Sequence, residues 1–354
     1  MTETAATVWI PADRLRAEVV RLLVAAGLTE ADARTVAESM VEASLRGVDS
    51  HGVAALGTYL RRLRAGATNP RPQVRIVRSG PAYILVDGDN GLGAIAGTFA
   101  MDKAIAGCRQ TGIFLALCMN NTTLGAAFYY ARMAALQGLI GITLSNAPPS
   151  MAPWGGRRPL LGTNPLSIAV PRREGEPIIL DMATSAAAKS KIYLAREKGM
   201  PIPEGWALDP EGRPTTDPEK ALKGLLMPLG GPKGYGLSLC IDLLTGALSG
   251  GGCMDKVASL HHGLDRGQNV SFLLAAIDPD LFAGRDRFLA EVEEVVAKVH
   301  GCPPAADSPG VFLPGELEAR TRQERLERGI PIPAKVAAEI RQEAAAIGVE
   351  VDWT

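Results

Sequence analysis

Residues 74–119 read VRIVRSGPAYILVDGDNGLGAIAGTFAMDKAIAGCRQTGIFLALCM, and this stretch decides the fold class. It contains three short apolar runs rich in β-branched residues, VRIVR, AYILV and IFLALCM, with a predicted helix over residues 94–109 before the last run. Further runs follow, LIGITLS, LSIAV and IILDM, with predicted helices near 124–137 and 185–198. Gly and Pro cluster between the runs, as in PPSMAPWGG. This alternation predicts a mixed α/β sheet domain.

The glycine-rich segment inside this stretch, GLGAIA at residues 91–96, matches the G-x-G-x-x-A pattern of dinucleotide-binding loops. In that interpretation, a pyrophosphate approaches the N-terminus of the following helix. The pattern also requires an acidic residue near the end of the next strand, but IFLALCM is followed by Asn120 and Asn121. The residues DGD that follow the apolar run also keep the turn from being tight. We therefore favour an ordinary loop and helix start, with a Rossmann dehydrogenase that uses GLGAIA as the alternative.

The N-terminal part of the chain is predicted to be helical. Apolar residues recur at helical spacing over residues 11–26 and stop at Gly27. Thr29 followed by Asp32 is typical of a helix cap, and that helix should run to about Arg46. A third helix is predicted from near Ser50 to Ala65.

The second half continues with GYGLSLCIDLLTGAL at residues 234–248, which is apolar nearly all round and is predicted to be a buried helix. The strand VSFLLAAID and a charged helix ending near His300 follow. Two amphipathic helices, about 316–328 and 334–346, should pack back on the N-terminal helices. We expect a helical domain over residues 1–75, with 316–354 packing on it, and an α/β domain over 76–315.

The overall composition favours a small-molecule substrate. The 354 residues include 37 basic and 38 acidic residues, a net charge of −1, so neither nucleic acid nor an acidic membrane surface is an expected partner. The five cysteines form no C-x-x-C pair, and the four histidines have no metal-ligand spacing, so we expect neither a disulfide framework nor a metal site. The N-terminus MTETAATVWIPADRLRAEVV does not resemble a secretory signal, and no long apolar span occurs, which favours a cytoplasmic location.

The segment RGVDSHGVAALGTYLRRL contains the candidate acid–base group. It places Ser50 and His51 at a predicted helix start, and on a continuous helix His51, Ala55 and Tyr59 would share one face. Histidine has the side-chain pKa nearest neutral pH, and a helix N-terminus disfavours its charged form, which makes it a readier proton donor. Ser50 can hydrogen-bond the ring or the backbone. The alternative is that Ser50 caps the helix and His51 is an ordinary surface residue.

Eight segments, in order along the chain, resemble the malate/L-lactate dehydrogenase family, which is unrelated to the Rossmann dehydrogenases. They are RGVDSHGV, GLGAIAG, NNTTLGAAFYYA, PWGGRRPLLGTNPLSIAVP, ILDMATSAAAKSK, WALDPEGRPTTDP, GGPKGYGLSLCIDLLTGALSG and LPGE. The family includes sulfolactate, ureidoglycolate and diketogulonate oxidoreductases and Δ1-piperideine-2-carboxylate reductases.

The resemblance implies a large, mixed, non-Rossmann sheet domain that binds NAD or NADP, and a helical domain built from both chain ends. It implies a homodimer with the active site near the subunit interface. The implied reaction is hydride transfer to or from a small 2-keto or 2-hydroxy acid. Two alternatives remain: a cyclic imine (ketimine) reductase of the same family, and a catalytically inactive cofactor-binding dimer.

The resemblance also assigns roles to residues of this sequence. His51 would donate the proton in reduction, because hydride arriving at a carbonyl carbon leaves negative charge on the oxygen, and Ser50 would assist it. Substrate would contact Thr163 and Tyr59. The implied cofactor residues are Thr123, Leu124, Gly125, Ala126, Ala127, Asp181, Met182, Ala183, Lys191, Lys233, Gly234, Gly315 and Glu316. The alternatives are a turn at Thr163, a helix cap at Thr123 and solvated surface charges at the two lysines.

Three positions depart from the family pattern. Ala55 stands where members commonly carry an arginine that clamps the substrate carboxylate, Thr123 stands where some carry a second histidine, and Ser190 replaces a glycine. Loss of an unreplaced clamp would weaken substrate binding by roughly 2–5 kcal/mol. Arg62 is predicted to lie too far along the helix to replace it. These departures suggest an altered substrate.

Overall fold

A seven-stranded sheet forms the centre of the computed structural model, which describes residues 7–353. Residues 1–6, part of the predicted helical domain and of the segment compared with secretory signals, and Thr354 lie outside the described residues. The strand order is β2-β3-β4-β11-β5-β6-β7. The strands are β2 (Arg75–Gly80), β3 (Tyr83–Asp87), β4 (Ile113–Asn121), β5 (Ile140–Ser145), β6 (Leu166–Val170), β7 (Ile178–Met182) and β11 (Val270–Ile277).

Only β3 and β4 run parallel in this sheet, and every other neighbouring pair is antiparallel. The prediction of a large mixed sheet is therefore confirmed. A Rossmann domain needs a mostly parallel sheet, so that alternative is wrong for this chain.

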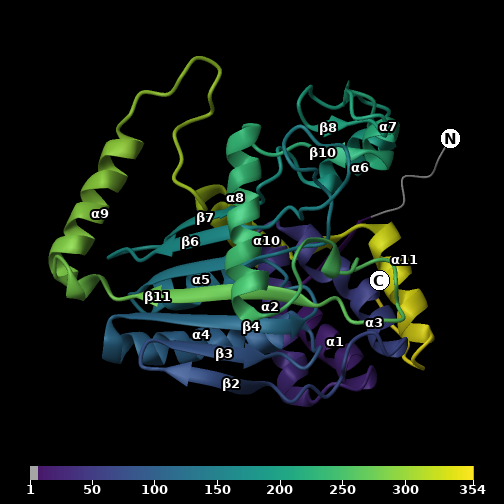
Figure 1. The fold of residues 1–354 in the computed structure, drawn as a ribbon, viewed down its shortest axis with the longest axis horizontal. Coiled ribbons are helices and arrows are strands. Elements are labelled where there is room, and N and C mark those ends of the chain that lie inside the picture. Colours follow the sequence, from purple (N-terminus) through teal and green to yellow (C-terminus); the bar gives the residue numbers. More distant parts are fainter. Residues whose placement is uncertain (1–6, 354) are drawn as a thin grey trace.

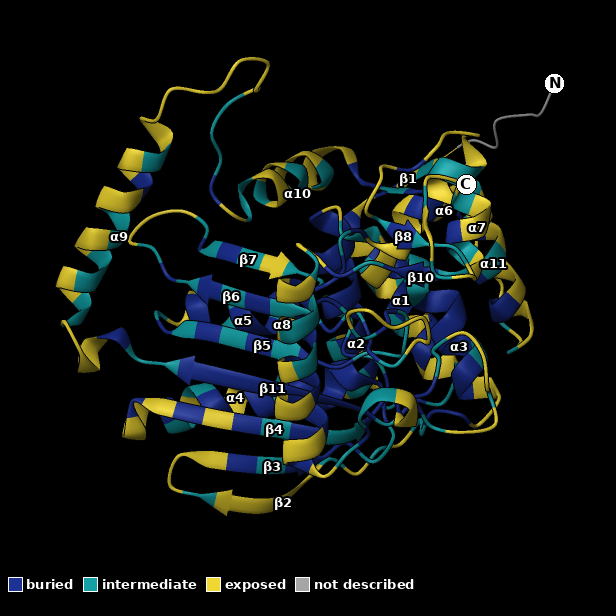
Figure 2. Cartoon of the chain, turned by 45° about the horizontal axis from the view of Figure 1, so that its top comes forward, coloured by how far each residue is buried: buried dark blue, intermediate teal, exposed yellow. Residues whose placement is uncertain are grey.

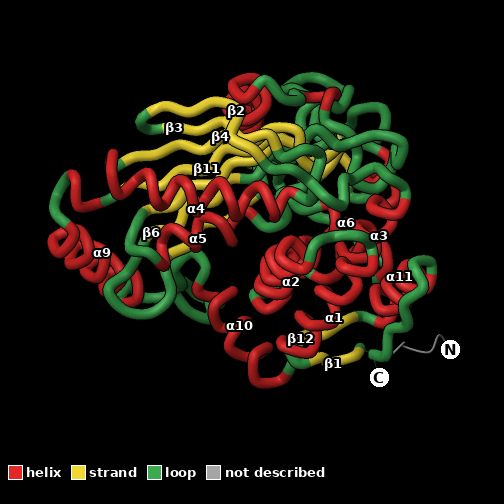
Figure 3. Tube along the Cα trace, turned by 90° about the horizontal axis from the view of Figure 1, so that it is seen from below, coloured by secondary structure: helices red, strands yellow, loops and turns green. Residues whose placement is uncertain are grey.

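Helices α4 (Gly93–Thr111) and α5 (Ala127–Leu136) cover one face of the sheet (Figures 1 and 3). Alternate residues of β4, namely Phe114, Ala116 and Cys118, are buried in the core that includes residues of these helices. Residues 91–96 are also buried, and a Cβ at Gly93 would lie 2.4 Å from the carbonyl oxygen of Thr123. GLGAIA thus lets α4 pack closely on the loop after β4, as the ordinary loop interpretation predicted.

The two ends of the chain meet in a helical core. Helices α1 (Ala12–Ala25), α2 (Glu30–Leu45), α3 (Leu56–Arg64) and α11 (Ala334–Ala345) contribute to it, and β1 (Val8–Ile10) pairs antiparallel with β12 (Ile330–Ile332). The predicted cap at Thr29 is present, because its Oγ1 accepts from the backbone N–H of Asp32 at 3.1 Å. Helix α10 (Glu316–Arg328) lies beside α2 (Figure 3).

The third predicted helix was wrong in its first half. Residues 49–51 and 53–55 form two separate 3₁₀ turns, η1 (Asp49–His51) and η2 (Val53–Ala55), and α3 begins only at Leu56. Gly52 separates the turns with φ −94° and ψ −149°, outside the helical region. A Cβ on Gly52 would lie 2.2 Å from Ser44 Oγ, so close packing against α2 forces this break.

A second correction concerns residues 234–248. They lie in α8 (Pro232–Asp242) and a π turn, η3 (Leu243–Ala247), and α8 crosses the sheet face opposite α4 and α5 (Figure 1). Figure 2 shows much of α8 exposed, and Leu243 and Leu248 are 49% and 58% exposed. In one copy of the chain this apolar helix is therefore not buried as predicted.

The remaining elements lie around the sheet. A small unit contains α6 (Lys189–Glu197), shorter than the predicted 185–198, with α7 (Pro218–Lys223) and the three-stranded sheet of β8 (Ala207–Leu208), β9 (Pro214–Thr215) and β10 (Leu225–Leu226). Helix α9 (Arg285–His300) stands at one side of the molecule (Figure 1). Two single turns, η4 (Met254–Lys256) and η5 (Pro279–Leu281), complete the chain. Within residues 7–353, no helix combines the length and apolar character needed to span a bilayer.

Candidate functional site

Most of the predicted site residues line one cavity of about 1300 Å³. Its wall includes the η1 turn, the loop after β4, the ends of β5 and β7, and the first turns of α6 and α10. The predicted residues in its wall are Ser50, His51, Thr123, Leu124, Gly125, Ala126, Ala127, Thr163, Asp181, Met182, Ala183, Lys191 and Gly315. Segments from across the sequence therefore meet at one site.

The imidazole of His51 faces this cavity. Ser50 Oγ lies 3.0 Å from His51 Nδ1, and the backbone N–H of His51 donates to Val48 O at 3.1 Å. The ring reaches solvent through the cavity, but surrounding protein strips much of its hydration and lowers the pKa of His51 below its ordinary 6.5. Loss of hydration is the cause of this shift, and His51 is the last residue of the η1 turn and not at the start of a longer helix as the sequence predicted. His51 is therefore mainly neutral at pH 7.

Four predicted residues lie outside the cavity wall. Tyr59 is 5% exposed in the helical core, and burial raises its pKa above the ordinary value. On one continuous helix Tyr59 would share a face with His51, but the break at Gly52 removes that helix. Lys233 is exposed at the start of α8 beside the buried Gly234, and Glu316 instead bonds His300 and Arg320.

The cavity wall suits an extended cofactor because many of its residues are small. Gly47, Gly125, Ala126, Ala127, Ala147, Ala183, Ala186, Ala187, Ala188 and Gly315 all line it. Their lack of long side chains leaves room for a ligand to approach the backbone. Gly125 has φ +80°, a left-handed conformation that favours glycine and shapes the loop before α5. The volume and the small side chains together fit a dinucleotide with a small substrate.

Asp181 gives this wall an unusual carboxyl group. Burial raises the pKa of Asp181 to about 7; the backbone N–H of Phe128 opposes the rise, and the negative charge of Glu318 adds to it. The carboxyl remains open to the cavity itself. It can therefore bind as an acid or as a carboxylate near neutral pH.

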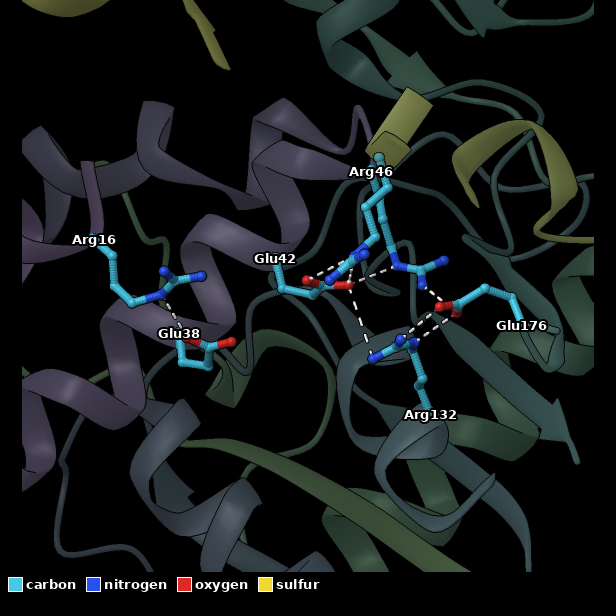
Figure 4. A network of polar contacts seen from close by, with 7 residues as sticks. Arg16, Glu38, Glu42, Arg46, Arg132 and Glu176 are labelled. Atoms are coloured by element: carbon cyan, nitrogen blue, oxygen red, sulfur yellow. Dashed lines mark hydrogen bonds and ion pairs between the residues drawn. The ribbon is translucent and has the colours of Figure 1, made fainter. Parts of the chain in front are cut away.

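The basic side chains near the cavity differ in whether other protein groups already bind them. Arg46 lines the cavity, but its guanidinium pairs with Glu42 at 2.9 Å and with Glu176 at 2.5 Å (Figure 4). Burial alone would raise the pKa of Glu176, but Arg132 and Arg46 together lower it to about 2. Arg46 is thus neutralised and is not a free clamp for a substrate carboxylate.

Arg62 is not a free clamp either. It is fully buried, and its guanidinium donates to four backbone carbonyls, including Arg266 O at 3.0 Å. Lys191 is different: it is exposed in the cavity wall, and among the described residues no carboxylate lies within ion-pair distance of it. It is available for an anionic ligand.

Sequence reasoning missed several wall residues. Ser145 ends the strand LIGITLS and Asn146 follows it directly, and Leu317 and Glu318 follow the LPGE segment. A polar residue directly after a buried strand was a signal that could have identified Asn146. Nothing local marked Glu318, which differs little from the other acids of its polar helix.

Comparison with known proteins identifies the family. The family model described as malate/L-lactate dehydrogenase matches residues 10–341. Malate dehydrogenase from Pyrococcus horikoshii is 40% identical over 349 residues, 96% of each chain. The solved structure of malate dehydrogenase from Pyrococcus horikoshii OT3 matches with a TM-score of 0.89 and 38% identity, over 97% of each chain.

Two further relatives state their cofactors in their names. (2R)-3-Sulfolactate dehydrogenase (NADP(+)) from Chromohalobacter salexigens is 36% identical, over 91% of this chain and 94% of the relative. Ureidoglycolate dehydrogenase (NAD(+)) from Escherichia coli O157:H7 is 35% identical, over 87% of each chain. This chain is therefore an oxidoreductase that belongs to the malate/L-lactate dehydrogenase family.

Proposed function

We propose that this chain catalyses the NAD(P)-dependent interconversion of a small 2-hydroxy acid and its 2-keto acid, with His51 as the acid–base residue. The observation that supports this most is the Ser50–His51 pair, which opens into the same cavity as the small-residue wall. A proton-transfer group and space for a dinucleotide are the two parts that such a reaction requires.

The bound nicotinamide would supply or accept the hydride. In oxidation, neutral His51 takes the proton of the substrate hydroxyl on Nε2, while Nδ1–H donates to Ser50 Oγ. In reduction, the protonated ring returns that proton to the substrate oxygen. Because the pKa of His51 is lowered, the base form dominates at pH 7 and oxidation needs no prior deprotonation.

The remaining cavity residues take the binding roles in this proposal. The loop from Thr123 to Ala127, the segment Asp181 to Ala183 and Gly315 would contact the cofactor, and Thr163 the substrate. Lys191 would bind an anionic group of either ligand, since it has no carboxylate partner among the described residues. The arginine clamp remains absent at Ala55, which packs partly buried against the helical core and does not line the cavity.

A substrate panel with a His51 variant tests the proposal. We expect turnover with 2-hydroxy or 2-keto acids, followed by nicotinamide absorbance, and a fall in kcat of about 10²- to 10⁴-fold in His51→Ala. Nucleotide affinity should be retained. His262→Ala is the control, because His262 is exposed and outside the cavity. Full turnover in His51→Ala would refute the assignment, and turnover of cyclic imines alone would redirect it to ketimine reduction.

We also propose that the chain is a homodimer through α8 and the sheet face beneath it. Leu237, Leu243, Leu244 and Leu248 are exposed there in one copy, as are Ile113 and Leu115 of β4. Apolar patches of this kind usually mark an interface. Leu229, which lines the cavity, lies just before α8, so a second copy would cover the chain beside the site. Leu244→Glu should give a monomer in sedimentation, and an unchanged mass would contradict this interface.

A further inference from the structure

Arg325 on α10 connects two parts of the cavity that are far apart in the sequence. Its Nη1 and Nη2 lie 2.6 and 3.1 Å from the two carboxylate oxygens of Asp49, and Nη1 also donates to the carbonyl of Ser44. The guanidinium thus bridges the last turn of α2 and the first residue of η1. Two parallel hydrogen bonds to one carboxylate fix orientation as well as distance.

The turn that Arg325 holds is the one that carries His51. Asp49 begins η1, and its carbonyl accepts from the backbone N–H of Gly52 at 3.1 Å. On the far side, Val53 N–H donates to Ser44 Oγ at 2.9 Å. Between α2 and α3 the chain has only these two short turns, and the Arg325–Asp49 pair ties the first of them to α10.

The other end of α10 belongs to the cavity. Leu317 and Glu318, in its first turn, line the wall, and Arg325 follows Glu318 by about two helical turns. A ligand that contacts the first turn therefore touches the same rigid helix that holds Asp49.

We propose that Arg325 is a positioning residue for His51, which it orients through Asp49 while tying the proton-transfer turn to the helix that lines the cofactor cavity. This inference rests on the proposed role of His51. The proposed role belongs to a residue of the C-terminal part of the chain and requires no contact with a ligand.

A neighbouring ion pair on the same helix provides a matched control. Arg322, one turn earlier, pairs with Glu42 of α2 at 2.9 Å, and Glu42 is 5% exposed, whereas Asp49 is 47% exposed. Exposed pairs contribute little to stability, and buried ones are costly to break. Loss of Arg322 should therefore affect stability at least as much as loss of Arg325, but only Arg325 holds the His51 turn.

The test compares Arg325→Met, Arg325→Lys and Asp49→Asn with Arg322→Met. We expect Arg325→Met to lower kcat about 10- to 100-fold, with nucleotide Kd changed less than threefold, because small misplacements of a catalytic group are costly. Arg325→Lys and Asp49→Asn should fall between it and the unaltered chain. Arg322→Met should lower the thermal midpoint at least as much and keep kcat within about twofold.

A second readout does not depend on turnover. Histidine ring signals in NMR spectra of the full chain, with His51 assigned through His51→Ala, should move or split in Arg325→Met and stay in place in Arg322→Met. Equal kcat in the two arginine variants, or an unmoved His51 signal in Arg325→Met, would overturn the inference. Turnover retained in His51→Ala would instead refute the proposed function, while the ring signal would still report whether Arg325 positions the turn.

Discussion

Gly52→Ala provides the sharpest test of how the His51 turn is built. The new Cβ would lie 2.2 Å from Ser44 Oγ and 2.9 Å from the backbone nitrogen of Ser44. The hydroxyl can rotate away, but it would then release the buried N–H of Val53, which it now accepts at 2.9 Å. The backbone nitrogen cannot move without shifting the end of α2.

The magnitude follows from these two contacts. An unpaired buried N–H costs about 1–3 kcal/mol, and overpacking a closed site adds about 1–3 kcal/mol. We expect Gly52→Ala to lower the free energy of unfolding by about 2–6 kcal/mol. Since His51 immediately precedes Gly52, a shift of about 1 Å in its ring would lower kcat on the order of 100-fold.

Urea denaturation and steady-state kinetics measure the two effects. Ser44→Ala is the control: it removes the Oγ contact but leaves the clash with the backbone nitrogen. Gly52→Ala should therefore be less destabilising in the Ser44→Ala background, by about 1 kcal/mol. If Gly52→Ala were stable to within about 0.5 kcal/mol and fully active, the argument that close packing forces the helix break would be wrong.

Three further predictions concern single groups in or near the cavity. The oxidation rate should fall as pH drops through the lowered pKa of His51, below 6.5, whereas reduction should rise over the same range; profiles with the opposite signs would contradict the assignment. The pKa of Asp181 is about 7 in the folded chain against an ordinary 3.8. The contribution of this carboxyl to the free energy of unfolding therefore falls as the pH rises from 3.8 to about 7. In urea titrations, Asp181→Asn should therefore be more stable than the unaltered chain at pH 8, but not below about pH 4. An equal effect on stability at the two pH values would count against the raised pKa of Asp181. Tyr59→Phe should leave KM within about twofold, because the ring lies in the helical core, and a large rise in KM would restore the predicted substrate contact.

Local sequence patterns predicted most of the secondary structure. Each strand of the seven-stranded sheet corresponds to an apolar run visible in the sequence, and the cap at Thr29 and both C-terminal helices are where the patterns place them. The very short strands, such as β1 and β8, were missed because two or three residues carry no usable periodicity.

Of the residues that were predicted for the candidate site, some line the cavity and others do not. The loop from Thr123 to Ala127 and the segment from Asp181 to Ala183 were assigned by resemblance, and both line the cavity. Tyr59 and Glu316 were assigned in the same way and lie outside it. Resemblance transfers the position of a residue in the chain, whereas the direction of its side chain depends on the backbone around it.

The sequence by itself determined which segments become strands and helices, because alternation and helical spacing are local properties of neighbouring residues. Only the tertiary structure decided that β11 enters between β4 and β5, that Gly52 interrupts a helix, and that Arg325 reaches Asp49. Each of these depends on atoms that are distant in the chain and meet only after folding, such as the Ser44 hydroxyl against Gly52. Contacts of this kind leave no periodic trace in the sequence.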